Sequence, residues 1–361
     1  MPRTFESLRH ENLQPARWWR MREEDRIECQ LCPRHCQLRE GQAGFCGTRI
    51  RHGPGLWLTA YGRTSGLCAD PIEKKPLYHF YPGSTALSLG TTGCNLACQF
   101  CQNWRISQAH GAGLPGIEAL PETIAELAHR EKYRSVAFTY NDPIVFAEQA
   151  IATAHACHAR GLKTVAVTAG YLSPEARADF FTIMDAANVD LKAFSDGFYR
   201  RLCHASLQPV LDTLDYLHRE TAVWLEVTTL LIPGENDSRD ELERAADWFA
   251  AHLGPDVPWH FTAFHPDYRL TDRPCTPAAA LSAARDIARA RGLRYVYLGN
   301  IRHPEATCTH CASCGLLLLR RDGFAVLENR LTAKHTCPQC HAPLPGRFAE
   351  TDQRPHLAGG Q

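Results

Sequence analysis

Short apolar runs alternate with longer segments of helical periodicity through the middle of the chain. The apolar runs predict strands at Thr85–Leu89, Ser135–Tyr140, Thr164–Thr168, Ala187–Leu191, Trp224–Ile232, Trp259–Phe264 and Tyr295–Leu298. The Ala- and Leu-rich segments between them predict helices such as Ile144–Arg160, Arg239–Leu253 and Pro277–Arg291. Strands that alternate with helices of this length indicate βαβ units and a parallel sheet. This number of units favours an α/β fold with a closed or partly closed barrel.

The flanking segments are rich in cysteine, glycine and proline instead. Residues 1–84 predict a Cys-rich N-terminal arm with a lead-in, and residues 85–302 predict the barrel. Within the arm, Arg17–Arg20 predicts an amphipathic helix with a buried aromatic face, and residues 59–84 predict an extended, solvated linker. Residues 303–348 predict a separate small module, and the polar, Gly-rich residues 349–361 predict a disordered tail.

Composition places the chain among ordinary soluble globular proteins. Its 361 residues are enough for a large α/β core with appendages. The formal net charge is zero, so there is no overall basic field to attract nucleic acid or an anionic membrane. No apolar run approaches the roughly 20 residues of a membrane span, and the N-terminus lacks an apolar signal core. We therefore expect a cytoplasmic protein, in which cysteines serve as metal ligands rather than in disulfides. Eleven of the 16 cysteines fall in three tight clusters, which supports this expectation.

Three cysteines stand together directly after the first predicted barrel strand. Cys94, Cys98 and Cys101 have C-x3-C-x2-C spacing, and thiolates are the ligands that hold iron–sulfur clusters. A closed structural site uses four protein ligands, whereas a catalytic centre keeps one position open. A zinc knuckle would need a fourth ligand close by in the sequence. Three cysteines on one tight loop therefore predict a [4Fe–4S] cluster with one iron free for an exogenous ligand.

Two further cysteine groups flank the barrel. Four cysteines in the arm have the spacing C-x2-C-x3-C-x9-C and predict a closed four-thiolate site, either zinc or a second iron–sulfur cluster: Cys29, Cys32, Cys36 and Cys46. In the C-terminal module, two C-x2-C pairs are separated by β-prone sequence and predict a zinc ribbon: Cys311, Cys314, Cys337 and Cys340.

The stretch Gly90–Trp104, with Phe100 just before the third cysteine, resembles the signature of the radical S-adenosylmethionine (SAM) superfamily. The resemblance implies a partial (βα)6-type barrel and a catalytic [4Fe–4S] cluster on Cys94, Cys98 and Cys101. It implies that the open iron chelates the amino and carboxylate groups of SAM. The reduced cluster then cleaves SAM to methionine and a 5′-deoxyadenosyl radical, so a reducing donor of flavodoxin or ferredoxin type is expected.

Polar residues follow the predicted strands, where barrels of this kind place their chemistry. We expect SAM contacts from Phe100, from Asn141 and Asp142 at the end of strand two, from Asp190 and Lys192 at the end of strand four, and from His260 in strand six. Asn141 and Asp142 occupy the place of the motif that holds the SAM amino group, although the family pattern has Glu at position 142. Structural alternatives remain open for these residues. Asp142 fits a helix cap, Asp190 and Lys192 fit a simple ion pair, and His260 fits a core histidine.

Residues 25–345 resemble the radical SAM component of the AmmeMemoRadiSam system more closely. The phrases that carry the resemblance are Pro76–Phe80, Cys101–Trp104, Ala187–Phe194 and Phe264–Tyr268. It implies two companion proteins without identifying the substrate. Asp190-Leu191-Lys192 also resembles the motif of glycyl-radical-enzyme activases, such as pyruvate formate-lyase activating enzymes. An activase acting on a partner protein is therefore the alternative enzyme, and a multi-zinc adaptor without catalysis is the alternative of another class.

Overall fold

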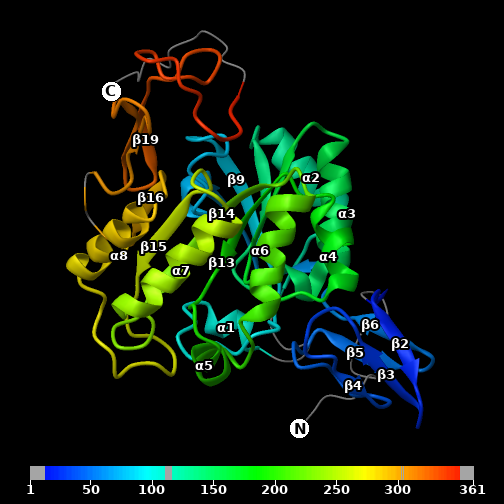
Figure 1. Cartoon of the computed structure of the whole chain (residues 1–361). Helices are drawn as coiled ribbons and strands as arrows, with labels where there is room; N and C mark the ends of the chain where they lie inside the picture. Colours follow the sequence, from blue (N-terminus) through cyan, green and yellow to red (C-terminus); the bar gives the residue numbers. More distant parts are fainter. Residues whose placement is uncertain (1–12, 110–115, 302, 304, 350–361) are drawn as a thin grey trace.

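A single curved sheet forms the centre of the protein. The computed structural model describes residues 13–109, 116–301, 303 and 305–349. The sheet has eight strands in the order β16-β15-β14-β13-β12-β11-β9-β8 (Figure 1). The strands are β8 (Gly66–Pro71), β9 (Thr85–Gly90), β11 (Ser135–Phe138), β12 (Lys163–Thr168), β13 (Ala186–Asp190), β14 (Trp224–Leu231), β15 (Trp259–Ala263) and β16 (Val296–Gly299). All neighbours pair in parallel except β8, which runs antiparallel to β9 at the edge.

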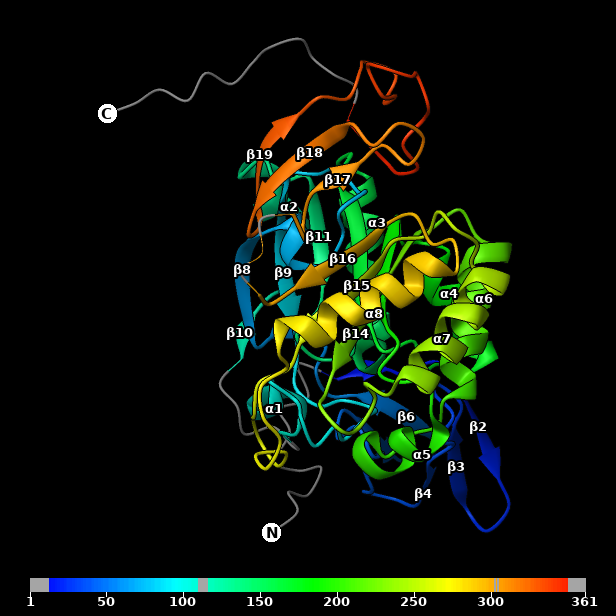
Figure 2. The same ribbon diagram turned by 60° about the vertical axis from the view of Figure 1, so that its left-hand side comes forward.

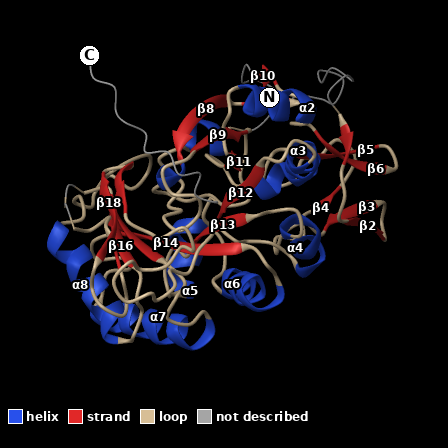
Figure 3. Ribbon diagram, turned by 90° about the horizontal axis from the view of Figure 1, so that it is seen from above, coloured by secondary structure: helices blue, strands red, loops and turns tan. Residues whose placement is uncertain are grey.

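Helices cover the outer, convex face of this sheet (Figure 3). They are α2 (Pro121–Arg130), α3 (Ala147–His158), α4 (Pro174–Phe181), α6 (Gln208–Glu220), α7 (Arg239–His252) and α8 (Ala278–Ala290). Each buries an apolar stripe against the strands; in α6, for example, Val210, Leu214 and Leu217 are buried while the opposite face is exposed. Short helices α1 (Trp104–Ser107) and α5 (Asp196–Phe198) lie at the carboxyl ends of the strands.

The α/β prediction is confirmed, and each predicted strand is present within one or two residues of its expected ends. The barrel is the partly closed form, because β8 and β16 stand at the two ends of the strand order. The helix predicted over Ile144–Arg160 is divided into a 3-10 turn, η4 (Pro143–Phe146), and α3. Asp142 begins this turn, with its side chain accepting a hydrogen bond from the Ile144 amide.

Two predictions for the N-terminal third are wrong. Residues 59–84 are not a solvated linker, because they contain β8 and a buried segment in which Ile72, Leu77 and Phe80 pack beneath the sheet. Arg17–Arg20 does not form a helix, since Trp19 begins strand β2 (Trp19–Arg22). Cross-strand pairing with β3 (Arg26–Cys29) decides this conformation, and such pairing is invisible to helical periodicity.

The two Cys-rich modules lie at opposite ends of the barrel (Figures 1 and 2). The N-terminal module consists of two small antiparallel sheets at the end that carries α1 and α5. Its strands are β1 (Gln14–Pro15), β2, β3, β4 (Gln37–Leu38), β5 (Arg49–His52) and β6 (Gly55–Leu58). A short ladder of β7 (Arg63–Thr64) and β10 (Ile117–Glu118) adjoins the barrel. The C-terminal module contains β17 (Thr309–His310), β18 (Leu317–Asp322) and β19 (Ala325–Asn329) at the other end.

Buried polar contacts attach the C-terminal module to the barrel. Arg321 and Glu73 are both fully buried and pair at 3.4 Å, and Arg321 also donates to the Tyr78 carbonyl at 2.6 Å. His79 reaches the carbonyl of Pro345 at 2.7 Å and the hydroxyl of Tyr297 at 2.6 Å. The predicted tail beyond residue 349 lies outside the described residues. Among the helices that are described, none combines the length and apolar character needed to cross a membrane.

Candidate functional site

The three-cysteine loop begins where β9 ends and is held in place by backbone hydrogen bonds. The Gly93 amide donates to the Ile106 carbonyl at 2.9 Å. Farther along, the amides of Ala97 and Gln99 donate to the carbonyls of Cys203 and Leu202 at 3.0 and 2.8 Å. These contacts fix the loop at both ends, so that Cys94, Cys98 and Cys101 all line one cavity of about 320 Å³.

The surroundings of the three thiols differ. Burial raises the pKa of Cys94, which accepts a hydrogen bond from the Leu96 amide at 3.5 Å. A hydrogen bond with the thiol of Cys203, together with burial, raises the pKa of Cys98. Burial also raises the pKa of Cys101, whose sulfur lies 3.1 Å from the Ser107 hydroxyl. These thiols therefore become thiolates only when a positive centre replaces their protons.

The carboxyl ends of the parallel strands supply the remaining wall of the cavity. Because parallel strands end at the same edge, residues distant in sequence meet there. The lining residues from successive strands include Asn141, Asp142, Thr168, Asp190, Lys192, Thr228, Thr262 and Asn300. Phe100 lines the same cavity, with its ring centroid 5.8 Å from that of Phe198. The structure thus brings together all the predicted site residues of the barrel except His260.

Asn141 holds the start of the cysteine loop. Its Oδ1 accepts from the Thr91 amide at 2.9 Å. Its Nδ2 donates to the Gly93 carbonyl at 2.8 Å and to the Thr91 hydroxyl at 3.1 Å. Both ends of the buried amide are therefore engaged with the loop. Asn141 acts here as a positioning residue, and its oxygen is already committed to Thr91.

The carboxylate of Asp142 points from the start of η4 toward the cavity. It accepts from the Ile144 amide at 3.2 Å, the Thr168 hydroxyl at 2.9 Å and the Ala169 amide at 3.0 Å. Burial raises the pKa of Asp142, while these donors favour its ionised form. The predicted helix-cap contact is therefore present. Carboxylate oxygens have further lone pairs, so the cap leaves capacity for one more donor.

Asp190 and Lys192 form an ion pair at the end of β13. Lys192 Nζ lies 2.6 Å from Asp190 Oδ2, and both side chains are partly buried at the cavity. Burial alone would lower the pKa of Lys192, but the negative charge of Asp190 raises it above its ordinary value. The pair thus places a permanent cation beside the sulfur of Cys98.

His260 lies away from the cavity and must be left out of the site. Its Nε2 lies 2.7 Å from the buried Glu226 carboxylate, which also accepts from the amides of Tyr78 and His79 at 2.9 and 2.7 Å. His260 is the second residue of β15, whereas Thr262 of the same strand reaches the cavity lining. The expected SAM contact is replaced by the core-histidine role.

Three contributors to the site were not predicted. Cys203 packs beside Cys98 from the π-helical turn η5 (Tyr199–Cys203), and Ser107 contacts Cys101 from α1. Lys74 lines the far side of the cavity from the segment before β9. Neither spacing nor periodicity marks Cys203 or Ser107, because tertiary packing alone brings them to the loop.

The two four-cysteine groups differ in their geometry. In the C-terminal module the ligand atoms of Cys311, Cys314, Cys337 and Cys340 all lie within 4.8 Å of one another, which fits one tetrahedral metal ion and a zinc ribbon. Among the described residues this is the one such group of three or more. The N-terminal cysteines are free thiols on β3 and neighbouring loops, where burial raises the pKa of Cys29 to about 11.

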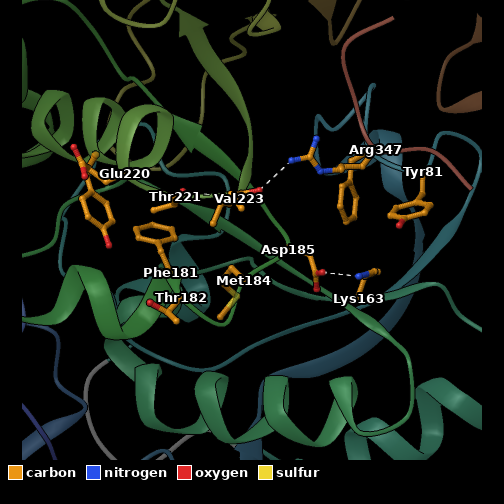
Figure 4. Close-up of a pocket in the computed structure, with 13 residues that line it drawn as sticks. Tyr81, Lys163, Phe181, Thr182, Met184, Asp185, Glu220, Thr221, Val223 and Arg347 are labelled. Atoms are coloured by element: carbon orange, nitrogen blue, oxygen red, sulfur yellow. Dashed lines mark hydrogen bonds and ion pairs between the residues drawn. The ribbon is translucent and has the colours of Figure 1, made fainter. Parts of the chain in front are cut away.

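A second cavity of about 380 Å³ lies at the amino ends of the strands (Figure 4). Three of the four charged residues in its lining already have ion-pair or hydrogen-bond partners. Lys163 contacts Asp185 at 2.8 Å, and Arg347 donates to the Ala222 carbonyl at 3.1 Å. It has no cysteine in its lining, and the cavity at the carboxyl ends is therefore the candidate active site.

Comparison with known proteins shows the family of the chain. The family model described as "Radical SAM superfamily" matches residues 88–249, from β9 to α7. The chain is 40% identical over 309 residues to an uncharacterised protein of Methanocaldococcus jannaschii, covering 86% of this chain and 92% of that protein. The chain belongs to the radical SAM superfamily. It is therefore an enzyme of oxidoreductase type, and membership implies a [4Fe–4S] cluster and SAM.

Two solved structures show a more distant similarity. A radical SAM methyltransferase from Sphaerobacter thermophilus is 15% identical, with a TM-score of 0.48 over 85% of this chain and 81% of that one. A domain of pyruvate-formate lyase-activating enzyme from Bacteroides vulgatus is 16% identical, with a TM-score of 0.41 over 46% of this chain and 99% of that one.

Replacing Asn141 with Ala should loosen the cysteine loop. The change leaves the buried Thr91 amide and Gly93 carbonyl without their partners, and each unsatisfied group costs about 1–3 kcal/mol. We expect a lower free energy of unfolding in denaturant and faster proteolysis within residues 91–108. The control is Gln102→Ala, an exposed residue of the same loop, which should change stability by less than about 0.5 kcal/mol. Equal stability of the two variants would contradict the positioning role.

Proposed function

We propose that Cys94, Cys98 and Cys101 bind a [4Fe–4S] cluster and that SAM occupies the adjoining cavity. The observation that supports this most is the convergence of three thiols from one loop with polar side chains from the carboxyl ends of the parallel strands. When bound and reduced, such a cluster with SAM supplies a 5′-deoxyadenosyl radical that abstracts hydrogen from a substrate. The substrate and the product are not assigned.

The residues of the cavity suit this pair of cofactors. Three cysteine ligands leave one iron without a protein ligand, and the cavity beside them is lined by acceptors for an ammonium group. Asp142 is the acceptor we assign to the SAM amino group, because its carboxylate faces the cavity and retains lone pairs. Phe100 offers an apolar wall on the cluster side.

Charge near the cluster is balanced by the Asp190–Lys192 pair. The Asp190 carboxylate lies 2.6 Å from the Lys192 ammonium and raises its pKa, so Lys192 stays protonated at neutral pH. A fixed cation there favours thiolate over thiol. We assign Lys192 to stabilising the anionic cluster and Asp190 to orienting Lys192. Phe100, Asp142, Asp190 and Lys192 thus form the proposed cofactor wall.

Partners follow from the same proposal. The cluster needs a one-electron donor, for which a flavodoxin- or ferredoxin-type protein is the expected class. Since residues 25–345 resemble the radical SAM component of the AmmeMemoRadiSam system, its two companion proteins are also expected partners. An activase acting on a glycyl radical protein remains the second candidate, supported by the Asp190-Leu191-Lys192 motif at the cavity.

The C-terminal module is proposed as a structural zinc ribbon. Its four sulfurs surround one ion position, with Cys311 and Cys340 3.5 Å apart and Cys314 and Cys337 3.6 Å apart. It stands at the end of the barrel opposite the cysteine loop (Figure 2). Zinc there stabilises the fold and takes no part in the reaction.

Removing the three loop thiols should remove the cluster. A Cys94/Cys98/Cys101→Ala variant, purified without oxygen, should lose about four irons and four sulfides per chain relative to the wild type. It should also fail to produce 5′-deoxyadenosine from SAM under reducing conditions. The control is Cys275→Ser, an exposed cysteine outside the three cysteine groups, which should keep all its iron. Full iron in the triple variant would overturn the assignment.

Asp142→Ala separates the SAM-binding role from the cap role. Loss of a charge-assisted hydrogen bond worth about 1.5–3 kcal/mol should weaken SAM binding about 10- to 100-fold, measured by calorimetry on the cluster-loaded protein. Iron content should stay near that of the wild type, since all three sulfurs remain. Asp142→Asn should be intermediate, because it keeps an acceptor oxygen and loses the charge.

A matched control isolates the cap. Ser238 caps α7 through the Glu241 amide at 3.3 Å and is not a residue of the cavity lining. Ser238→Ala should lose about 1 kcal/mol of stability and keep its SAM affinity. If Asp142→Ala behaves in the same way, the carboxylate is a helix cap and makes no contact with SAM.

Cys340→Ser should release the zinc while leaving the catalytic site intact. Because ribbon ligands are ordered by their metal, we expect loss of about one zinc per chain and new protease cleavage within residues 311–345. Iron content should not change, since the module lies at the other end of the barrel. Unchanged zinc together with unchanged protease resistance would exclude a ribbon.

A further inference from the structure

The four N-terminal cysteines are largely shielded from solvent, and Cys46 lies against the cysteine loop. Cys29, Cys32 and Cys46 are each less than 9% exposed, and Cys36 is partly buried. Two sulfurs already accept hydrogen bonds, Cys36 from the Phe45 amide at 3.5 Å and Cys46 from the Thr48 hydroxyl at 3.3 Å. N–H and O–H donors aimed at sulfur stabilise thiolates that hold a metal centre.

A buried cation accompanies these thiols. Arg49 is 1% exposed and binds both carboxylate oxygens of Glu148 at 2.8 and 2.6 Å. Its Nε is buried and has no hydrogen-bond partner among the described residues. The sulfurs of Cys29 and Cys46 lie near enough to Arg49 to interact with its charge. A guanidinium with an unused donor, beside two of the four thiols, matches an anionic centre that the four cysteines would hold.

The spacing of the sulfurs argues for a cluster rather than one ion. Zinc–sulfur bonds of about 2.3 Å place tetrahedral ligands roughly 4 Å apart. The C-terminal cysteines meet this requirement, whereas no other described group of three or more does. The sulfur atoms of the N-terminal cysteines, and those of the Cys94 loop, are therefore farther apart than the ligands of one ion. A [4Fe–4S] core, in which each thiolate binds a different iron, spans such a gap.

The two groups of thiols meet through one backbone contact. Gly93 has φ of +82°, and a Cβ atom there would overlap the carbonyl oxygen of Cys46. Gly93 immediately precedes Cys94. The backbone next to Cys94 is therefore in van der Waals contact with the carbonyl group of Cys46. Arg34, from the arm, adds a hydrogen bond from its Nε to the Asn95 carbonyl at 2.6 Å. In Figure 1 the N-terminal module lies at the same end of the barrel as α1.

We propose that Cys29, Cys32, Cys36 and Cys46 hold a second [4Fe–4S] cluster, which passes electrons to the cluster on the Cys94 loop. A low-potential, one-electron protein donor of flavodoxin or ferredoxin class reduces the second cluster, and the donor is oxidised. The second cluster then gives this electron to the loop cluster and returns to its oxidised state. No proton or bond is transferred. The metal assignment stands alone, whereas the relay role rests on the proposed radical SAM function.

Metal analysis and spectroscopy of the unaltered protein provide the first test. Anaerobically purified chain should contain about eight irons and eight sulfides. After reduction, electron paramagnetic resonance should show two S = 1/2 cluster signals, of which only one changes when SAM is added. About four irons, a single signal and two zincs per chain would overturn the proposal, because the arm would then hold zinc.

Variants separate this proposal from the proposed function. Cys29→Ala/Cys36→Ala should retain about four irons and the SAM-responsive signal, whereas Cys94/Cys98/Cys101→Ala should retain about four irons and the other signal. Cys275→Ser is the control and should retain both. If Cys29→Ala/Cys36→Ala (the arm variant) keeps all its iron, the second cluster is excluded. If Cys94/Cys98/Cys101→Ala keeps all its iron, the proposed function fails instead.

Reduction kinetics test the relay. Stopped-flow absorbance should show the loop cluster of the arm variant accepting an electron from reduced flavodoxin at least about tenfold more slowly than in the wild type. Dithionite, a small reductant that reaches the cavity directly, should reduce it in both proteins, which shows that the loop cluster is intact. An unchanged rate with flavodoxin would overturn the relay.

Discussion

The close approach of Gly90–Gly93 to the turn after β11 is the constraint on which the site depends. A Cβ atom on Gly90 would overlap the Thr139 carbonyl, so only glycine lets the two strand ends come together. Because the two segments are close, the side-chain amide of Asn141 forms hydrogen bonds with the backbone of both Thr91 and Gly93. The start of the cysteine loop is thereby fixed to the neighbouring strand, and the positions of Cys94 and Asp142 are set relative to each other.

Polar side chains have different roles at the two ends of the sheet. At the carboxyl ends, the polar side chains line a cavity and leave capacity for ligands. At the other end they satisfy one another: Glu226 accepts from His260, two backbone amides and Trp224, and Arg321 is bound by Glu73, Tyr78 and Thr309. Burial lowers the pKa of His79 to about 4, so this histidine is neutral in the network. Such extensive mutual pairing is typical of structural support rather than catalysis.

The N-terminal module lies at the end of the barrel that carries the candidate site. Its loops contact the cysteine loop from one side, while η5 contacts it from the other through Leu202 and Cys203. The loop is thus enclosed by segments that lie before and after it in the chain. Enclosure of this kind restricts water around the sulfurs and raises the pKa of their thiols, so a metal centre that binds there must displace the thiol protons.

The sequence by itself determined the order of strands and helices, because periodicity and apolar runs report local burial. It also determined the three cysteine groups, since ligand spacing is local. Tertiary structure alone decided the rest. Gly66–Pro71 pairs with β9 as an edge strand, and Ile72, Leu77 and Phe80 pack against the sheet. His260 pairs with Glu226, and Cys203 lies beside Cys98. Each of these depends on contacts between segments distant in sequence, for which a single sequence carries no periodic signal.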